Sequence, residues 1–411
     1  MSNKNYVPLN EFILLQRGFD LPQGERIYGD VPVVASTGIA GFHNEYKVGA
    51  PGVVIGRSGT IGGGQYITQN FWPLNTTLWV KDFKGHDARY VYYLLKSIDF
   101  QRFNVGTGVP TLNRNHLSSV LVKNLEYKNE KVIAKILGDL DDKIHLNNQI
   151  NQTLESIAQA IFKSWFIDFE PVRAKIAAKQ EGKDPERAAM CAISGKSEAE
   201  LEQMAKEDFA ELQATAALFP DELVESELGE VPKGWSIAKV DGILNRIKIK
   251  KRFKKNDVNE FGRTFVLEQG SNIILGFHND EGSIPASKEE PVFIFGDHTC
   301  ITKLMLSNFD VSENVIAVTG KERNSYWTYY AIRDLQKFQE YRRHWMELVS
   351  KQVVMADLNL TDYFAKKVKT LHEEIENFVH ENLVLINLRD TLLPKLLSGE
   401  VDVSDLQSEG D

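Results

Sequence analysis

The sequence predicts an α+β protein in which an antiparallel pair of long coiled-coil helices separates two globular segments of mixed α/β structure. Three observations carry this prediction. Short motifs recur in the same order in the two halves of the chain, a heptad pattern of apolar residues follows each set of motifs, and the region between the halves is acidic. The whole chain is therefore predicted to be a pseudo-two-fold internal repeat.

The recurring motifs are the clearest sign of this repeat. The pentapeptide Gly41–Glu45 returns 235 residues later as Gly276–Asp280. Each copy is followed by an apolar run that ends in glycine, a tyrosine-rich stretch and a Leu-Asn pair: Val53–Gly56 and Val292–Gly296, Tyr90–Tyr93 and Tyr326–Tyr330, Leu112–Asn113 and Leu358–Asn359. The Leu-Asn pairs are 246 residues apart, so the copies contain insertions and deletions. Chance similarity between two generic α/β segments is the alternative, and the shared order argues against it.

The heptads after each copy predict the helix pair. One core set of the first helix is Ile133, Leu140, Leu154 and Ile161, and the other is Ile136, Ile150 and Ile157. The positions 235 residues later are Val368, Ile375, Arg389 and Leu396 for the first set, and Leu371, Leu385 and Leu392 for the second. Asn147 and Asn382 occupy the same core position in the two helices. A polar residue there costs stability and fixes register, so we predict that this pair sets the helix register.

Composition and turn residues place the boundaries of the parts. We expect a first globular segment over 1–128 and a long helix over 129–170, with Pro171 at its end or at a kink. An acidic linker with short helices follows over 171–231. A second globular segment over 232–365, a second long helix over 366–402 and an acidic tail over 403–411 complete the chain. Antiparallel pairing of the helices would bring Asn147 near Asn382 and place the globular segments at opposite ends.

Bulk composition excludes several protein classes. The chain has 411 residues, of which 42% are hydrophobic and 26% charged, a balance typical of folded globular domains. No apolar run reaches the roughly 18–20 residues that a membrane span needs, and Met1–Asn5 leads into no signal-peptide core, so we expect a cytoplasmic protein. The two cysteines, Cys191 and Cys300, lie far apart without metal-ligand neighbours. We therefore expect neither a disulfide framework nor a metal site.

A net charge of −9 is unfavourable for nucleic-acid binding, but the distribution of the charges is not. Acidic residues crowd between Glu181 and Glu230 and return in the tail, whereas basic residues are densest from Arg246 to Lys255. A local basic surface can bind phosphate whatever the total charge is.

Four stretches closely resemble one protein family. The run Leu137–Ile144 with Ile161–Val172 resembles the central conserved region of the specificity subunits of type I restriction–modification systems, the HsdS family. Leu228–Trp235 is similar to the entry to their second recognition domain, and Leu388–Val401 is similar to their C-terminal conserved helix. The resemblance covers essentially the whole chain.

The resemblance implies a non-catalytic subunit. Each globular segment would be a target-recognition domain that reads one half of a bipartite, asymmetric site in double-stranded DNA. Because duplex DNA repeats every ~34 Å, recognition domains held tens of Å apart can address two half-sites about one turn apart. The two helices would set the gap and dock two methyltransferase subunits, and restriction subunits would complete the enzyme. ATP, Mg²⁺ and S-adenosylmethionine would belong to these partners.

Catalytic motifs are missing from the sequence. No Pro-Pro pair occurs, as an amino-methyltransferase motif would require, and the glycine-rich run Gly56–Gly64 lacks the lysine of a P-loop. A fused enzyme is therefore a remote alternative. The competing hypothesis is an interaction scaffold, in which the helices drive assembly and no DNA sequence is read.

Two loops of the first segment are candidates for DNA contact. In the glycine-rich run, the backbone can approach phosphate while Arg57, Ser58 and Thr60 offer hydrogen bonds. A mobile loop between strands is the equally weighted alternative. The turn-rich stretch 106–114 offers Thr107, Thr111, Asn113 and Arg114, and family members carry a similar loop there. An ordinary connector is the alternative reading of this stretch.

The basic run of the second segment is a candidate for phosphate contact. Its alternation predicts a strand with Ile247 and Ile249 on one face and Arg246, Lys248 and Lys250 on the other, followed by Lys251 and Arg252. Like charges this crowded favour a polyanion partner. The alternative is a solvated edge strand protected by lysines.

Two further groups of residues have competing interpretations. His43 and His278 recur in the repeated motif, and residues that read different bases should differ, so we expect both histidines to brace the fold. The cluster Trp165, Phe166 and Phe169 is interpreted either as core or as a docking surface for the methyltransferase.

Overall fold

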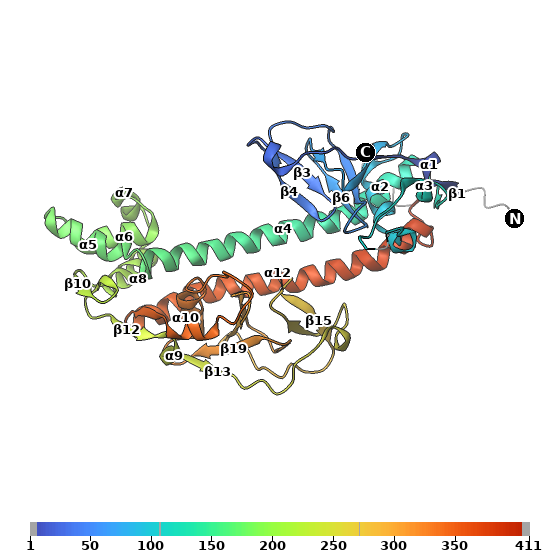
Figure 1. Ribbon diagram of the computed structural model, residues 1–411. Helices are drawn as coiled ribbons and strands as arrows, with labels where there is room; N and C mark the ends of the chain where they lie inside the picture. The colour runs from blue at the N-terminus through green and yellow to red at the C-terminus, as the bar shows by residue number, and fades with distance from the viewer. Residues whose placement is uncertain (1–5, 107, 271, 405–411) are drawn as a thin grey trace. The chain divides into compact units, whose positions relative to one another are not determined.

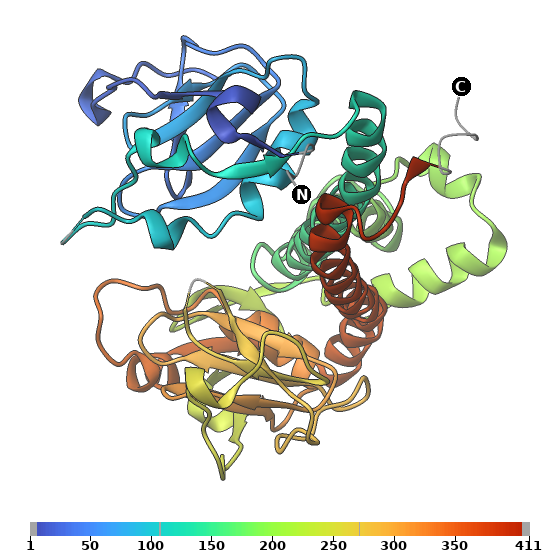
Figure 2. The ribbon, with the colours of Figure 1, turned by 90° about the vertical axis from the view of Figure 1, so that its right-hand side faces the viewer.

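The computed structural model describes residues 6–106, 108–270 and 272–404. The chain forms two compact units (Figures 1 and 2). The first unit comprises Met1–Leu146 and Val384–Asp411, and the second unit comprises Asn147–Leu383. Each unit therefore contains a globular part and a portion of both long helices.

The globular part of the first unit consists of short strands and helices in one continuous stretch. They are β1 (Tyr6–Pro8), α1 (Leu9–Phe12), β2 (Leu14–Arg17), η1 (Gln23–Glu25), β3 (Val31–Ala35), β4 (Gly38–His43), β5 (Gly52–Gly56), β6 (Gly62–Ile67), β7 (Trp72–Pro73), β8 (Thr77–Asp82), α2 (Ala88–Lys96), η2 (Phe100–Phe103), α3 (Arg114–Leu117) and β9 (Leu121–Lys123). They form a four-stranded sheet in the order β2-β8-β5-β6, a three-stranded sheet β4-β3-β7 and the pair β1-β9.

The globular part of the second unit has an equivalent series of elements. They are β12 (Ser236–Lys239), α9 (Val240–Ile243), β13 (Leu244–Arg246), η3 (Lys255–Asp257), β14 (Thr264–Leu267), β15 (Ile274–His278), β16 (Val292–Gly296), β17 (Thr302–Met305), β18 (Phe309–Val311), β19 (Val315–Gly320), α10 (Ser325–Ile332), α11 (Trp345–Ser350) and β20 (Gln352–Met355). They form the sheets β13-β19-β16-β17 and β15-β14-β18 and the pair β12-β20.

The strand order confirms the internal repeat. Each sheet of the first unit has a counterpart in the second with the same number of strands and the same order along the chain. Both three-stranded sheets contain one parallel pairing, β3 with β7 and β14 with β18, while their other pairing is antiparallel. The helices α2 and α10 occupy the same place after the last strand of the four-stranded sheet.

The apolar runs identified in the sequence become the central strands β5 and β16. Every residue of both strands is buried. Each has a strand on either side, and a tyrosine-rich helix packs on each sheet, α2 on β5 and α10 on β16. A continuous apolar run fits such a position because neither face of the strand meets water. The helices begin at side-chain caps, where Asp87 accepts a hydrogen bond from Tyr90 N and Asn324 accepts one from Tyr326 N.

The two long helices are α4 (Tyr127–Phe166, 40 residues) and α12 (Leu358–Ser398, 41 residues). The sequence placed the end of the first near Pro171, but α4 stops at Phe166 and Pro171 lies in the first turn of the next helix, where its missing N–H costs nothing. The helices run antiparallel within each unit. In the second unit Phe162 packs on Phe364, and in the first unit Asp141 pairs with Arg389.

Burial along α4 corrects the predicted seam at one position. Ile133 is buried, and Leu140, Leu154 and Ile161 are partly buried, so the first core set is confirmed. In the second set Ile136 and Ile150 are also partly buried, but Ile157 is 43% exposed and the adjacent Ala158 is fully buried, so the prediction is wrong at position 157. A heptad seam alternates steps of three and four residues. The isoleucines predicted a step of three from Leu154 to Ile157, but the helix uses the step of four, from Leu154 to Ala158.

The segment between the units' globular parts is mainly helical. It contains α5 (Glu170–Gln180), α6 (Pro185–Ser194), α7 (Glu198–Glu202), α8 (Lys206–Ala217) and the hairpin β10 (Leu223–Ser226)–β11 (Gly229–Pro232). A small apolar cluster around Met190 and Leu212 holds α6, α7 and α8 together. Among the residues that the structure describes, no helix is both long and apolar enough to span a membrane.

Candidate DNA interface

The two candidate loops of the first unit lie against each other. Ser58 and Thr111 form an antiparallel bridge, Leu112 N donates to Arg57 O over 2.8 Å, and Gly59 N donates to Pro110 O over 2.9 Å. We call residues 57–61 and 104–113 the first loop pair. The candidate residues come from two separate stretches of the sequence and lie on one surface. Backbone hydrogen bonds from each loop to the other hold the two loops together.

Side chains of the first loop pair combine a cation with short polar groups. Arg57 is half-buried, and its Nη1 lies 3.4 Å from Asn75 O. Thr60 and Asn113 are exposed, and Asn113 uses its side-chain oxygen to cap α3 at Asn115 N. The Thr111 hydroxyl donates to Val109 O over 3.1 Å. Thr107 lies outside the described residues.

Sequence reasoning missed Arg17 at the end of β2. Its Nε donates to Asn75 O over 3.3 Å, the same carbonyl that Arg57 reaches. Two guanidinium groups therefore converge beside the first loop pair. A lone arginine at the end of a short strand gives no signal in the sequence, because only the fold brings it to Asn75.

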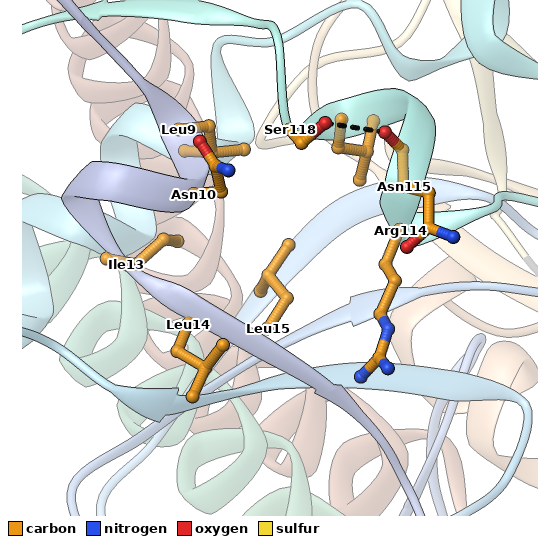
Figure 3. Close-up of a pocket in the computed structure, with 9 residues that line it drawn as sticks. Leu9, Asn10, Ile13, Leu14, Leu15, Arg114, Asn115 and Ser118 are labelled. Atoms are coloured by element: carbon orange, nitrogen blue, oxygen red, sulfur yellow. Dashed lines mark hydrogen bonds between the residues drawn. The ribbon is translucent and has the colours of Figure 1, made fainter.

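Arg114 borders a groove of about 290 Å³ next to these loops. Figure 3 shows it on the α3 side of the groove, with Leu14 and Leu15 of β2 and Asn10 of α1 on the other walls. The Arg114 side chain is exposed. It can reach a ligand in solution, but its surroundings are partly apolar.

The basic segment of the second unit alternates as predicted, although its strand is short. Ile247 and Ile249 pack against the core, whereas Arg246, Lys248 and Lys250 are exposed. The strand β13 ends at Arg246, and Ile247 N continues the pairing with one hydrogen bond to Ala317 O of 2.9 Å. Within the part of the chain that the structure describes, Lys248 and Lys250 form no ion pair.

Arg252 is exposed and also forms hydrogen bonds within the protein. Its Nη1 donates to Ser312 O over 2.6 Å and to Val315 O over 2.9 Å. Burial lowers the pKa of this guanidinium. Arg252 therefore clamps its own chain against a neighbouring loop. Lys251 lies with Nζ 4.1 Å above the ring of Phe253.

A second pair of loops in the second unit is joined in the same way as the first. His344 N donates to Asp297 O over 2.7 Å, and the rings of His298 and Tyr341 lie 4.7 Å apart. We call residues 297–301 and 333–344 the second loop pair. None of these residues was predicted to contact DNA, although the run Tyr341-Arg342-Arg343 is a signal of nucleic-acid binding.

Comparison with known proteins identifies the family. The family model described as "Type I restriction modification DNA specificity domain" matches residues 1–156. The type I restriction enzyme HindI specificity subunit of Haemophilus influenzae is 30% identical over 334 residues, 71% of this chain and 71% of that protein. The chain belongs to the family of type I restriction enzyme specificity subunits.

A second specificity subunit and one solved structure are also similar to this chain. The MjaIX specificity subunit of Methanocaldococcus jannaschii is 25% identical over 350 residues, 78% of this chain and 71% of that protein. The crystal structure of a type I restriction–modification S subunit from M. genitalium superposes with a TM-score of 0.52 at 14% identity, and the match covers 97% of each chain. The fold of this specificity subunit is therefore shared along its length.

The repeated histidines of the specificity subunit brace its fold, as predicted. His43 is buried, accepts a hydrogen bond from Ile27 N of 3.0 Å and meets Trp72 edge-on. His278 is buried, lies 2.9 Å from Asp310 Oδ2 and stacks on Phe253. Neither ring is open to a ligand.

The aromatic cluster at the end of α4 is core. Trp165 and Phe166 are 2% exposed and Phe169 is 6% exposed, all within the main apolar core of the second unit. Side chains this deeply buried offer no contact area to a methyltransferase subunit. We therefore correct the docking interpretation in favour of core packing.

The two seam asparagines meet, as the repeat predicted. Asn147 Nδ2 donates to Asn382 Oδ1 over 2.9 Å, and Asn382 Nδ2 donates to Asn148 Oδ1 over 3.0 Å. Both Asn147 and Asn382 are buried. These two hydrogen bonds form in one alignment of the helices, and a shift by one turn would leave both buried amides without them.

Proposed function

We propose that this specificity subunit reads a bipartite, asymmetric site in double-stranded DNA, with one unit on each half-site. The observation that carries the proposal is the repeated loop pair. Each unit has the same strand order and joins its two loops by an equivalent backbone hydrogen bond, but the side chains of the two loop pairs differ. Two similar frames that present different side chains suit two different half-sites, and a site read in this way is asymmetric.

The side chains divide into two roles under this proposal. Arg57, Ser58, Thr60, Thr111 and Asn113 would meet bases and phosphates of the first half-site, because arginine and short polar side chains can bond to both. The exposed Arg246, Lys248, Lys250 and Lys251 would neutralise phosphates of the second. Phosphate neutralisation releases counterions, so affinity should fall steeply with salt.

We further propose that catalysis belongs to partner subunits. Two methyltransferase subunits would dock on this chain and restriction subunits would join them, with ATP, Mg²⁺ and S-adenosylmethionine bound by those partners. The missing methyltransferase and P-loop motifs support this division. Asn147 and Asn382 would hold the register of the helix pair and thereby the spacing of the half-sites.

The decisive experiment is reconstitution. The full chain is combined with the methyltransferase subunit of its system, and the methylated positions of a plasmid library are sequenced. We expect one asymmetric motif with two defined halves and a fixed gap. Methylation without such a motif, or none at all, contradicts the proposal.

Salt dependence separates this function from a scaffold. The triple variant Lys248→Glu, Lys250→Glu, Lys251→Glu should bind DNA weakly, with the slope of log affinity against log salt smaller by about one per lost phosphate contact. The control is Lys196→Glu, an exposed lysine between α6 and α7. Equal slopes in the wild type, the triple variant and the control would favour the scaffold.

A further inference from the structure

The loop between α10 and α11 takes the place of a loop already assigned to DNA in the other unit. In the first unit, the chain between α2 and α3 touches the turn after β5 through Leu112 N and Arg57 O. In the second, the chain between α10 and α11 touches the turn after β16 through His344 N and Asp297 O. Arg57 and Asp297 each follow the glycine that ends the central strand. The two loops are therefore equivalent by position and by backbone contact.

Aromatic rings project from this loop into solvent. Tyr341 is 75% exposed and Phe338 is 54% exposed. The ring of His298 supports Tyr341 from the other loop of the pair, and Phe338 lies edge-on to His344 at 6.3 Å. Large rings held on a supported loop supply contact area at small entropic cost, which is typical of binding surfaces.

Arg343 adds an available cation next to these rings. Its side chain is 78% exposed, and its ion pair with Asp297 is long, at 3.8 Å. The neighbouring Arg342 pairs with Glu340 over 2.9 Å and also with Glu347. Arg343 therefore keeps donors for a ligand, while Arg342 is used within the loop.

The basic segment begins beside the same loop. The Arg246 guanidinium lies 5.8 Å from the ring centre of Trp345, the residue that directly follows the loop. Exposed lysines then continue along the extended chain. A polyanion that lies on this segment passes the loop that carries Tyr341 and Arg343.

We propose that Phe338, Tyr341 and Arg343 form the base-reading surface of the second half-site, and that the basic segment only holds its phosphates. This inference rests on the proposed function and assigns the second unit's specificity to residues of the α10–α11 loop. Arg343 donates to base edges such as those of guanine, and the rings make apolar contacts such as those with the thymine methyl group.

The test measures sequence preference in the reconstituted methyltransferase complex. Tyr341→Ala, Phe338→Ala and Arg343→Gln should each reduce discrimination at positions of one half of the motif, by about fivefold or more, since each removes a contact to a base. The other half should keep its preference. Tyr341→Phe should behave as wild type if the ring makes the contact, and equal loss in Tyr341→Phe and Tyr341→Ala would overturn the ring contact.

Two controls distinguish loss of base reading from weaker phosphate contact and from unfolding. Lys251→Gln should weaken binding to all sequences alike and leave both halves of the motif unchanged. Circular dichroism and thermal unfolding should match wild type for all loop variants, because the replaced side chains are exposed. If wild type gives no bipartite motif, the proposed function fails. If wild type gives the motif and folded loop variants alter neither half, this inference alone is overturned.

Discussion

The two units share a strand order but differ where the tyrosine-rich helix meets a long helix. In the first unit, the Tyr93 hydroxyl donates to Asp141 over 2.7 Å, and Asp141 also accepts from Arg389 over 2.6 Å. In the second unit, the Tyr330 hydroxyl lies 2.7 Å from His372 Nε2 and 3.2 Å from Glu155 Oε1, and Arg333 pairs with Glu155. Both units therefore have a tyrosine at this joint, but different side chains form the hydrogen bonds to its hydroxyl.

The apolar packing around these joints differs as well. The second unit uses aromatic rings, where Phe162 touches Phe166, Trp327 and Phe364. The first unit uses aliphatic side chains, with Leu137, Leu396 and Leu397 in its core. We infer that the central strands and the helix seam determine the fold. The side chains at the joints can differ between the units as long as they fill the same space and form their hydrogen bonds.

The largest losses of stability should come from replacing a large apolar side chain at one joint with alanine. Phe162→Ala in the second unit should cost about 3–5 kcal/mol, and Leu397→Ala, 235 residues later, should cost the first unit about 2–5 kcal/mol, because each leaves a cavity in a buried cluster. Native-state hydrogen exchange with urea locates the loss. We expect weaker protection mainly in the unit that carries the change. Equal loss in both units for each variant would show that the units do not have separate cores.

The stability of the second unit should depend on pH, because its joint contains a buried histidine. The pKa of His372 is lowered to about 4, mainly by burial and in part by Lys303 and Arg333, while Glu155 and Glu376 oppose the shift. An unfolded histidine has a pKa of about 6.5, so the unfolded state binds the proton more tightly. Stability is therefore complete above pH ~6.5 and is lost as pH falls from there towards 4, by about 3 kcal/mol at most.

The variant His372→Leu copies Leu137, the residue 235 positions earlier, and should remove this loss. Urea unfolding of wild type and variant at pH 7, 6, 5 and 4.5 checks it. His380→Leu is the matched control, because that ring is half-exposed on the same helix. If wild type and His372→Leu lose stability in parallel as pH falls, the buried histidine is not the cause.

Periodic features could be predicted from the sequence, and contacts between unrelated stretches could not. The repeat, the central strands and the meeting of Asn147 with Asn382 follow from spacing, because backbone geometry repeats at a fixed period. The burial of Trp165 and the clamp of Arg252 depend on what the fold places opposite them. The second loop pair was missed for the same reason, since its two loops are far apart in the sequence and meet only in the fold, for example through the hydrogen bond from His344 N to Asp297 O.

The helix seam shows where periodic reasoning itself reaches its limit. Steps of three and four residues both keep a heptad, so the larger side chain at 157 was preferred over the small one at 158. The structure buries Ala158 completely, in the same apolar cluster as Phe162, and leaves Ile157 43% exposed.

Substitutions at two adjacent positions, 157 and 158, test which of them faces the core, and they should have the smallest effects on stability. Ala158→Ile should cost about 1–3 kcal/mol, since extra methylene groups overfill a packed seam. Ile157→Ala should change stability by only about 0.5 kcal/mol, as expected for an exposed side chain. Urea unfolding of both variants, followed by tryptophan fluorescence, decides between the two registers. A large loss for Ile157→Ala with little change for Ala158→Ile would restore the three-residue step and shift the face that α4 presents to α12 within the second unit.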